Sequence, residues 1–452
     1  MMINYIPHFT ENQYYITHSQ TINEENSLVE TDISSIRDTG EVTCPKCSGK
    51  VHVYDSYTRK VLDYPVLPRY KHILNVRIHR YRCQTCSHTF SEQPSFVEEG
   101  TRVTKLAASW MKAYLSENMS VKSVSSLTGV SWNTVRRIQQ RYMEEIVNGV
   151  DRYKKFKGYR PKYLAVDEFA IHKGHTYATC VMDLKDGEIL WVGKGRAKKD
   201  FKKFFEFVKE TEPDLLSEVK AFAMDMNASY NRLVEEHIPH ADIVYDRFHI
   251  QAQFGKDVLG SVRLESARRH QNEANKLKEK YEEETDPLKK LEMRKEEKEK
   301  RHKYAVVKKS RWPILTGQEN LTEKTRTMID ELLEEHLDLA VCYAMKEEMR
   351  EIFSCDDEEY ARIRWEEWFN RAIESGIPQL VKFAENKKER IDGLINHAKH
   401  KINTARLEGF NNRIKVAKRI AYGYRDDEYF FTLIRYMSLS EEHAELFEKM
   451  YA

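Results

Sequence analysis

The stretch YLAVDEFA, residues 163–170, decides the fold of the central part of the chain. Its apolar residues are typical of a buried strand, and Asp167 is the acid at the end of that strand. A carboxylate at the tip of a buried strand is held by a rigid scaffold and still faces solvent, so it can bind a hard cation without the cost of deep burial. Asp167 is therefore the first candidate catalytic residue.

The segments that follow this strand predict a sheet of defined order. HTYATCVMDL (175–184) and EILWVGKGR (188–196) are typical of strands, and Asp186-Gly187 between them predicts a hairpin turn. The next elements are a helix at 200–210, a strand at 219–226 that ends at Asp225, a helix at 230–238 and a strand at 241–250. The order βββαβαβ, with acids on the first and fourth strands, is that of a ribonuclease-H-like mixed sheet.

Two carboxylates on neighbouring strands of such a sheet can share divalent cations. The strands of Asp167 and Asp225 are neighbours in this fold, so the two acids could hold two Mg²⁺ (or Mn²⁺) ions about 4 Å apart for in-line displacement at phosphorus. This geometry usually needs a third acid. The candidate is Glu408, which lies in a polar, basic segment at 405–434.

Other acids and one histidine extend or compete with this set. Asp183 and Glu168 are alternatives on chemistry alone, but Glu168 is expected to point to the opposite face of its strand from Asp167. The sequence YDRFHI places Asp246 and His249 at an i, i+3 spacing, which faces one site if the chain is helical there. His249 then either contacts a phosphate or a metal-bound water, or forms a structural pair with Asp246.

Composition limits the class of protein. The 452 residues are enough for two to four domains, and 40% of them are hydrophobic. A mean hydropathy of −0.70 and the lack of a long apolar run predict no membrane span, and the polar N-terminal sequence does not resemble a signal peptide. The net charge is only +2, so nucleic-acid binding must depend on local clusters. We expect a cytoplasmic, nucleoid-associated protein.

Four of the seven cysteines form two C-x2-C pairs. Cys44 and Cys47 are separated from Cys83 and Cys86 by 35 residues of β-rich pattern, which is typical of a zinc ribbon. Each tight turn can direct its two thiolates to the same ion, so the pairs predict one structural, closed Zn²⁺ site. The alternatives are two unrelated turns or a redox pair, and His88 is a weak additional ligand candidate. Seven cysteines of this spacing fit a reducing compartment better than a disulfide framework.

A helix-turn-helix pattern follows in SVKSVSSLTGVSWNTVRRIQQRY, residues 120–142. Gly129 would make the turn and Ser131 would cap the second helix. The expected inward-facing residues are Val121, Val124, Leu127, Val130, Val135 and Ile138. The second helix would offer to DNA the outward side chains Trp132, Asn133, Arg136, Arg137 and Arg141. The alternative is an ordinary helical hairpin with a basic surface.

Basic residues recur on both sides of the acids. The link at 151–163 could follow DNA phosphates or be a solvated linker. Around Glu408, the expected donors to a DNA backbone are Arg406, Asn411, Asn412, Arg413, Lys415, Lys418 and Arg419, unless this helix is simply solvated. The aromatic residues that follow are expected to pack and not to stack on bases: Tyr422, Tyr424, Tyr429, Phe430 and Phe431.

The helical signal of residues 255–400 predicts an insertion in the sheet domain. It includes two charged helices that turn at Asp286-Pro287. The expected fold class is multidomain, α+β and α/β. The predicted parts are an N-terminal arm at 1–40, a zinc ribbon at 41–98, a helix-turn-helix domain at 99–150, the first part of a catalytic core at 151–254, an all-helical insertion at 255–400, and C-terminal core helices at 401–452.

The separated motifs together resemble those of bacterial DDE transposases, most closely the insertion-sequence family called L-three. The motifs are CPKC, CQTC, VDEFA, AMDMNASY, VYDRFH and LEGFNNRIK, and the resemblance covers nearly everything after residue 40. It implies that Asp167, Asp225 and Glu408 correspond to the three metal-binding catalytic acids of the family. It also implies that Asp246 and His249 match the DxxH pattern that follows the second acid in related transposases.

The resemblance implies a Mg²⁺-dependent transposase that binds double-stranded DNA. The zinc and helix-turn-helix modules would bind the terminal inverted repeats of a mobile element, and the acids would cut its ends and join them to target DNA. Bringing two ends together implies a homodimer or a higher oligomer. Two other classes share the motifs: a non-enzymatic DNA-binding regulator derived from a transposase, and a nuclease that cuts without strand transfer.

Overall fold

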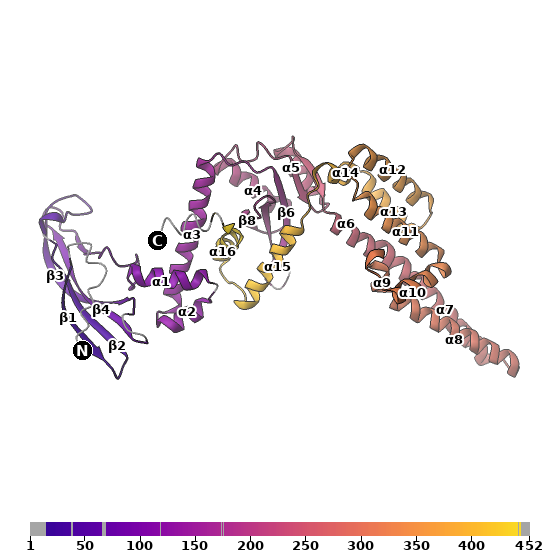
Figure 1. The fold of residues 1–452 in the computed structure, drawn as a ribbon, viewed down its shortest axis with the longest axis horizontal. Helices are drawn as coiled ribbons and strands as arrows, with labels where there is room; N and C mark the ends of the chain where they lie inside the picture. The colour runs from indigo at the N-terminus through magenta and orange to yellow at the C-terminus, as the bar shows by residue number, and fades with distance from the viewer. Residues whose placement is uncertain are drawn as a thin grey trace. The chain divides into compact units, whose positions relative to one another are not determined.

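A computed structural model of the chain describes residues 15–37, 39–65, 69–117, 119–172, 174, 176–441 and 443. The chain divides into two compact units, Met1–Asn148 and Gly149–Ala452. Each unit contains a mixed β-sheet, and most of the helices belong to the second unit (Figure 1). Within the described residues, no helix has the length and apolar character needed to cross a membrane.

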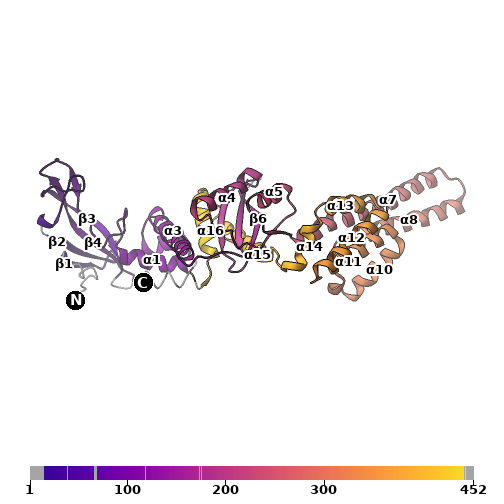
Figure 2. The same ribbon diagram turned by 90° about the horizontal axis from the view of Figure 1, so that it is seen from above.

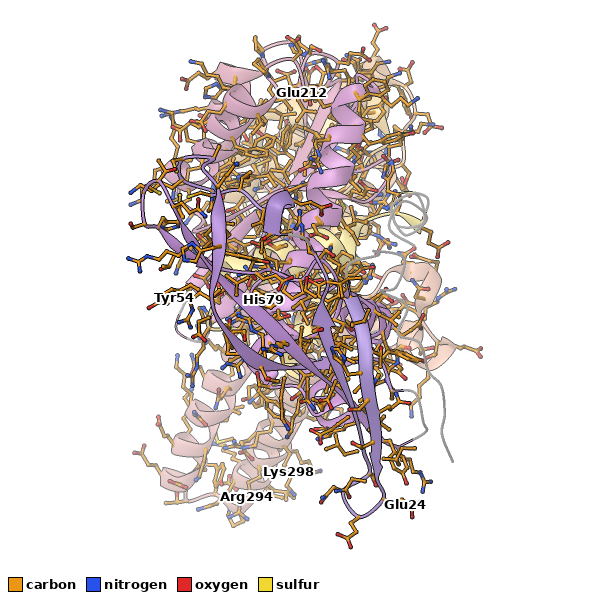
Figure 3. The ribbon with its side chains drawn as sticks, turned by 90° about the vertical axis from the view of Figure 1, so that its left-hand side faces the viewer. Glu24, Tyr54, His79, Glu212, Arg294 and Lys298 are labelled. Atoms are coloured by element: carbon orange, nitrogen blue, oxygen red, sulfur yellow. The ribbon has the colours of Figure 1, made fainter. Side chains whose placement is uncertain are left out.

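The sheet of the first unit begins in a region where the sequence predicts an arm. β1 (Tyr15–Asn23) and β2 (Leu28–Ser35) form an antiparallel hairpin with Glu24 in its turn (Figure 3). β2 runs parallel to β4 (Lys71–Cys83), and β4 pairs antiparallel with β3 (Val51–Asp63) and β5 (Thr89–Ser91).

The prediction of an N-terminal arm is wrong for residues 15–35. Val29, Thr31 and Ile33 alternate along β2 and are each at most 1% exposed, so this strand buries one face in the sheet core. A polar strand with a short apolar alternation gives a weak sequence signal, because its stability comes from its partner strand. The remainder of the predicted arm, residues 1–14, lies outside the described part.

Three helices follow the sheet: α1 (Lys105–Ser116), α2 (Val121–Thr128) and α3 (Trp132–Phe156). Gly129 ends α2 with a φ of +69°, and Ser131 Oγ accepts the N–H of Thr134 at 3.3 Å, as the sequence predicts for a turn and a cap. Val124, Val135 and Ile138 are buried as expected. Leu127 is 59% exposed, so its inward assignment is wrong, and Thr128 is buried instead.

The second unit contains the sheet order that the sequence predicts. Its elements are β6 (Tyr163–His172), β7 (Thr176–Asp183), β8 (Ile189–Lys194), α4 (Lys198–Thr211), β9 (Ala221–Met224), α5 (Ala228–His237) and β10 (Asp242–Tyr245). The strands lie in the order β10-β9-β6-β7-β8. β6, β7 and β8 are antiparallel neighbours, while β9 runs parallel to β6 and β10 runs parallel to β9.

Helices lie over the sheet of the second unit (Figure 2), and the side chains of β6 alternate between two covered faces of this sheet. Leu164 and Val166 pack in the same core as the aromatic residues of α4, among them Phe201 and Phe204. Ala165 and Phe169 pack on the other face, under α15 (Ala405–Ile420) and α16 (Asp427–Ser438). The residues that cover this second face therefore come from the far C-terminal part of the sequence.

The aromatic residues around α16 follow the predicted packing with one exception. Tyr429 and Phe430 are buried, and the ring of Tyr424 stacks on Phe430 with centroids 4.4 Å apart. Phe431 packs partly buried against the same core. Tyr422 is 100% exposed, so the expectation that it packs is wrong; it lies just after α15, where the helix has ended.

All regular elements between β10 and α15 are helices. These are α6 (Arg247–Phe254), the π-helix η3 (Gly255–Leu259), α7 (Gly260–Glu283), α8 (Pro287–Lys309), α9 (Arg311–Leu315), the 3-10 turn η4 (Gln318–Asn320), α10 (Glu323–Glu335), α11 (Leu337–Ile352), α12 (Glu358–Glu374), α13 (Pro378–Lys388) and α14 (Ile391–His400). α7 and α8 form a long hairpin that turns at Asp286-Pro287 as predicted, and Asp286 caps α8 (Figures 1 and 2).

Candidate functional site

Three carboxylates meet where β6 and β9 lie side by side. Asp167, Glu168 and Asp225 each offer a ligand oxygen, and these oxygens all lie within 4.8 Å of one another. β9 pairs with β6 only as far as Ala165, and Asp225 directly follows β9. Asp167 is not at a strand end, because β6 continues to His172; it lies instead beside the point where its neighbour stops. The parallel pairing thus brings two distant acids together.

Glu168 belongs to this cluster, contrary to the expectation that demoted it. Asp167 lies on the same face of β6 as Ala165 and Phe169, and Glu168 lies on the opposite face. The expected alternation is therefore correct. The conclusion drawn from it is wrong, because a long glutamate side chain beside the open end of β9 reaches the same space as Asp225.

The electrostatics of the cluster favour a bound cation. Burial raises the pKa of Asp167 to about 7; the N–H of Glu168 opposes this, and the charges of Asp225 and Glu168 add to it. Burial also raises the pKa of Glu168. Carboxylates that crowd in a partly buried space repel one another, and oxygen donors of this kind are the ligands of Mg²⁺ and Mn²⁺. The donor set therefore fits a divalent cation.

His249 and Asp246 join the cluster from α6. β10 ends at Tyr245, short of the predicted 250, because Asp246 caps α6 by accepting the N–H of Phe248 at 2.8 Å. The Nδ1 atom of His249 is in contact with Asp225 Oδ1 and lies 3.4 Å from Asp246 Oδ2. Hydrogen bonds to Asp225 and then Asp246 raise the pKa of His249 to about 10. The helical turn that the sequence requires for a shared site is therefore present.

Glu408 lies on α15 between two residues that contact the site. Thr404 Oγ1 donates a hydrogen bond to Asp246 Oδ2, and Asn411 Nδ2 donates to Asp167 Oδ2 at 2.7 Å. Positions 404, 408 and 411 share one face of a helix, so Glu408 points to the side of the acids. Its carboxylate is nevertheless not in the group within 4.8 Å, as far as the described residues go. The helix of Glu408 thus reaches the site, while the carboxylate stands apart.

A cavity of about 440 Å³ opens at the three acids. Arg390, the residue before α14, lines it together with residues of β6 and of the start of α5. This arginine is the cation of the cavity lining, and it places positive charge where a phosphate would approach the acids. Sequence reasoning missed Arg390, because its position within a helical segment gives no spacing signal that links it to the acids.

The basic residues of α15 have unequal roles. Arg406 donates to the carbonyls of Leu184, Lys185 and Asp186 and so holds the β7–β8 turn. Lys418 donates to the carbonyl of Ala170. The predicted DNA-binding residues Arg413, Lys415 and Arg419 are exposed, as is Asn412. Arg406 and Lys418 therefore support the fold, while the exposed residues remain available to a ligand.

Two other expectations change in the structure. The predicted link at 151–163 begins inside α3, and Lys154 forms a buried ion pair with Glu188 at 2.5 Å. This lysine therefore neither follows phosphates nor faces solvent. Asp183, an alternative catalytic acid, is fully buried in the β7–β8 turn, where Oδ1 accepts the N–H of Lys185 at 2.8 Å. Its position fits a turn residue and not the acid cluster.

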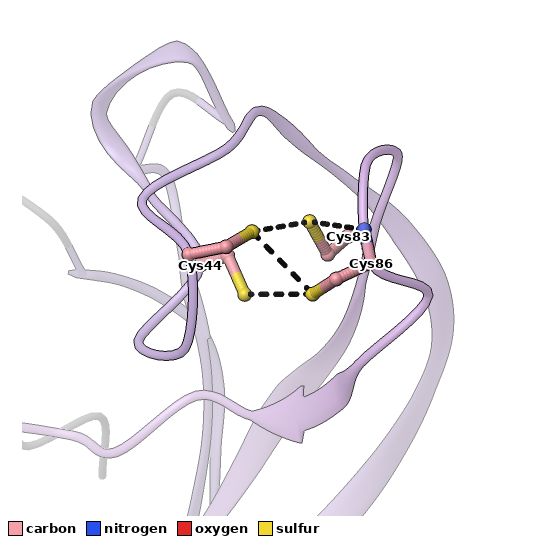
Figure 4. Close-up of side chains that lie close together, drawn as sticks. Cys44, Cys83 and Cys86 are labelled. Atoms are coloured by element: carbon pink, nitrogen blue, oxygen red, sulfur yellow. Dashed lines mark hydrogen bonds between the residues drawn. The ribbon is translucent and has the colours of Figure 1, made fainter.

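The four predicted cysteines form a cluster in the first unit (Figure 4). Their sulfur atoms are 3.7 Å apart for Cys44 and Cys86, 3.5 Å for Cys47 and Cys83, and 3.4 Å for Cys47 and Cys86. Sulfurs around a tetrahedral Zn²⁺ with Zn–S bonds of about 2.3 Å lie about 3.8 Å apart. The backbone N–H of Cys86 lowers the pKa of the Cys83 thiol to about 6, which favours the thiolate. The set therefore fits one zinc ion, and His88 does not belong to it.

Of the side chains that the sequence predicts on the outside of the helix-turn-helix, some contact the preceding loop. Trp132 is 47% exposed and Asn133 is exposed, and Arg136 lies over the Trp132 ring at 5.6 Å. Arg137 and Arg141 donate to the carbonyls of Gly100 and Glu99, respectively. The last two arginines thus hold the preceding loop against α3, while the first turn of the helix presents Trp132 and Asn133.

Comparison with known proteins finds transposases. Residues 164–434 match the DDE model of family ISL3, described as transposase, and residues 92–143 match the helix-turn-helix domain of transposase family ISL3. The chain is 33% identical over 394 residues to the transposase for insertion sequence element IS1001 of Bordetella parapertussis, with 87% of each chain covered. It is 26% identical over 328 residues to that for IS1557 of Mycobacterium tuberculosis, covering 70% of this chain and 68% of the relative.

Solved structures are also similar, among them the Drosophila P element transposase strand transfer complex. The sequences are 12% identical, and the match covers 76% of this chain and 94% of that one with a TM-score of 0.34. This score is too low to establish a shared fold. The helix-turn-helix prediction, in contrast, is confirmed by the family match over residues 92–143.

Proposed function

The chain belongs to the ISL3 family of transposases, and from this membership we propose that Asp167, Asp225 and Glu408 are its catalytic acids. As a DNA-binding transposase, it would bind the terminal inverted repeats of its element, cut the ends and join them to target DNA. The observation that carries the assignment is the meeting of Asp167 and Asp225 at the junction of β6 and β9. The strand order β10-β9-β6-β7-β8 supports a ribonuclease-H-like core.

The side chains around the acids have distinct proposed roles. Two divalent cations, Mg²⁺ or Mn²⁺, would supply the Lewis-acid chemistry for attack by water and then by a 3′-hydroxyl at phosphorus. Asp167 and Asp225 would hold them, and Asn411 fixes the orientation of Asp167 through its 2.7 Å hydrogen bond. Glu408 would complete the set from α15 by a change of side-chain rotamer. Glu168 is a further candidate ligand.

His249, Asp246 and Arg390 would position the substrate and the acids. Asp246 is 2% exposed and ties α6 to Thr404 at the start of α15, so it fixes the two helices that border the site. His249 contacts Asp225 with a side chain that is 45% exposed, so it can also reach a phosphate. Arg390 would neutralise the charge of the phosphate that enters the cavity.

DNA recognition is assigned to the first unit and to the exposed face of α15. The proposed zinc ion, held by Cys44, Cys47, Cys83 and Cys86, would be structural because four thiolates leave no open position. Trp132 and Asn133 would read the duplex, and Arg413, Lys415 and Arg419 would contact its backbone near the cut. Two ends must be brought together, so a homodimer or a higher oligomer is the proposed active form.

A strand-transfer assay tests the proposal. The full chain is incubated with Mg²⁺ or Mn²⁺, labelled DNA from the two ends of its element and a target plasmid. We expect cleavage at the element ends, and labelled DNA joined to the plasmid, only with the metal. Metal-dependent cleavage without joined products would make the chain a nuclease. DNA binding without cleavage would make it a regulator.

A further inference from the structure

A second cavity lies among the helices that follow the sheet, outside the acid cluster. Its volume is about 930 Å³, and it is formed by α6, η3, the start of α7 and the junction of α8 with α9. The lining is rich in cations, which are Lys256, Arg263, Lys308 and Arg311, and it contains one acid, Asp257. The charge of the lining indicates an anionic ligand.

Arg263 is the buried cation of this cavity. It is 5% exposed, and its Nη1 donates to the carbonyls of Val307 and Lys308 at 3.1 and 3.0 Å, in the last turn of α8. Among the residues that the structure describes, no group is a hydrogen-bond partner of its buried Nε. Burial and the charge of Arg311 both lower the pKa of Arg263. The hydrogen bonds of Nη1 to the end of α8 therefore account for one part of this guanidinium, and within the described part of the chain its Nε has no partner.

The rim of the cavity combines exposed cations with exposed rings. Lys256, Lys308 and Arg311 are all exposed. Phe248 in the lining is 42% exposed, and Trp312 beside Arg311 is 70% exposed. The guanidinium of Arg311 lies 5.1 Å from the centroid of the Trp312 ring. Large open rings beside cations are the features of a surface that holds unpaired nucleotides, because bases stack on the rings while phosphates contact the cations.

Building on the proposed function, we propose that this cavity binds a single-stranded segment of DNA next to the cleavage site. Lys256, Lys308 and Arg311 contact its phosphates, and Phe248 and Trp312 stack on its bases. The location supports this occupant, since Phe248 directly precedes His249, which contacts Asp225. A strand that leaves the acids along α6 therefore reaches the cavity at once. A fully paired duplex would leave the two rings without bases to stack on.

Binding of the full chain to two DNA probes tests the inference. One probe is a blunt duplex of the element end, and the other carries a single-stranded extension of about 15 nucleotides at the cleaved end. The test variant combines Lys256→Gln, Lys308→Gln and Arg311→Gln. The control combines Lys289→Gln, Lys295→Gln and Lys298→Gln at exposed positions of α8, where Lys298 is visible in Figure 3. Both variants lose the same charge, and thermal unfolding verifies that both are folded.

We expect the test variant to bind the extended probe about 10- to 100-fold more weakly than the control variant. The slope of log K against log salt should fall by about 2, because each lost phosphate contact on a single strand contributes about 0.7. The blunt probe should bind equally to both variants. Trp312→Ala should weaken binding of the extended probe alone, and Trp312→Phe should restore it.

Equal affinities and equal salt slopes of the two triple variants on the extended probe would overturn the inference. An equal loss on both probes would overturn it too, because the cavity would then attract any DNA through charge alone. The proposed function fails by a different result, the absence of metal-dependent cleavage of element ends by the wild-type chain. The two failures are therefore separable.

Discussion

The cysteine cluster and the acid cluster both gather groups that bind metal ions, but they differ in how they are built. Three pairs of the cysteine sulfurs lie 3.4–3.7 Å apart, close to the spacing of a closed tetrahedral site. The acid cluster is half-open, its carboxylates repel one another, and Glu408 stands outside it. A structural site needs a complete set of ligands, whereas a catalytic site must keep room for a substrate. The difference fits the proposed roles, in which the cysteine cluster stabilises the fold and the acid cluster acts on DNA.

The largest expected effect is the loss of the first unit when the cysteine cluster is broken. Cys83→Ser removes one ligand of the proposed zinc ion, and a structural zinc contributes on the order of 10 kcal/mol to folding in small zinc domains. We expect thermal unfolding to lose the transition of the first unit and DNA binding to disappear. Cys355→Ser, in the second unit and outside the cluster, should behave as wild type. A Cys83→Ser chain that stays folded and binds DNA would show that the cysteine cluster is not needed to stabilise the first unit.

For the acid cluster we expect a loss of activity without a loss of stability. Asp225→Asn should reduce end cleavage roughly 10³-fold, which corresponds to about 4 kcal/mol of lost metal-assisted stabilisation. The melting temperature in metal-free buffer should change little, because the removal of one repelling carboxylate charge offsets the loss of the ion pair between Asp225 and His249. Activity and unfolding are measured in parallel with Asp214→Asn, an exposed acid of the same unit, as the control. A large fall in melting temperature would assign Asp225 a structural role.

An acid that is fully paired inside the protein provides an intermediate case. Glu188 is 2% exposed and contacts Lys154 and His443, with Oε1 2.6 Å from His443 Nδ1. Glu188→Gln should destabilise the chain by about 3 kcal/mol at neutral pH, because Lys154 is left buried and unpaired. Chemical denaturation measures this change. A loss below about 1 kcal/mol would show that the pair contributes little.

The pH dependence of this pair follows from the pKa of Glu188. Burial opposes ionisation, but the charge of Lys154 and hydrogen bonds lower this pKa from 4.5 to about 2. A lowered carboxyl pKa gives stability that is present above pH 4.5 and lost as the pH falls toward 2. The difference in free energy of unfolding between wild type and Glu188→Gln should therefore shrink across this window. A constant difference would contradict the ionised pair.

The smallest expected effect concerns Glu168. As an additional ligand of the cluster, Glu168→Gln should lower end cleavage about 10-fold, or about 1.4 kcal/mol, because a neutral amide oxygen still coordinates weakly. The loss should be largest at low Mn²⁺ concentration and shrink as the metal is raised. An effect as large as that of Asp225→Asn would make Glu168 one of the essential acids. A rate equal to wild type at all metal concentrations would remove it from the site.

The sequence predicts those parts of the molecule whose geometry depends on local spacing or regular periodicity. The C-x2-C pairs, the Gly129 turn and the Asp286-Pro287 turn are local features, and each lies where expected. Strand order also predicts the meeting of Asp167 and Asp225, because the pairing of β6 with β9 follows from the order of elements. Residue spacing within the motifs therefore locates the cysteine cluster, and the order of strands and helices locates Asp167 and Asp225.

What sequence reasoning misses depends on contacts between distant segments. Arg390 reaches the acids only because α14 packs beside β10, and Lys154 is buried only because Glu188 lies opposite it. β2 appears polar by itself and is stabilised by β4. Glu168 was set aside by strand alternation, which describes the face of a side chain but not the reach of a long one beside the end of a neighbouring strand. These errors share one cause, the absence of partner information in a single segment.

Glu408→Gln is the sharpest test of the proposed catalytic triad, because Glu408 lies on the helix face that points to the acids but outside their cluster. Single-turnover cleavage of labelled element ends with Mg²⁺ is compared between this variant, Asp225→Asn and the exposed-acid control Glu428→Gln on α16. We expect Glu408→Gln to lose cleavage as fully as Asp225→Asn, while its DNA binding and unfolding match those of Glu428→Gln. Cleavage at the rate of the control would contradict a catalytic triad completed from α15.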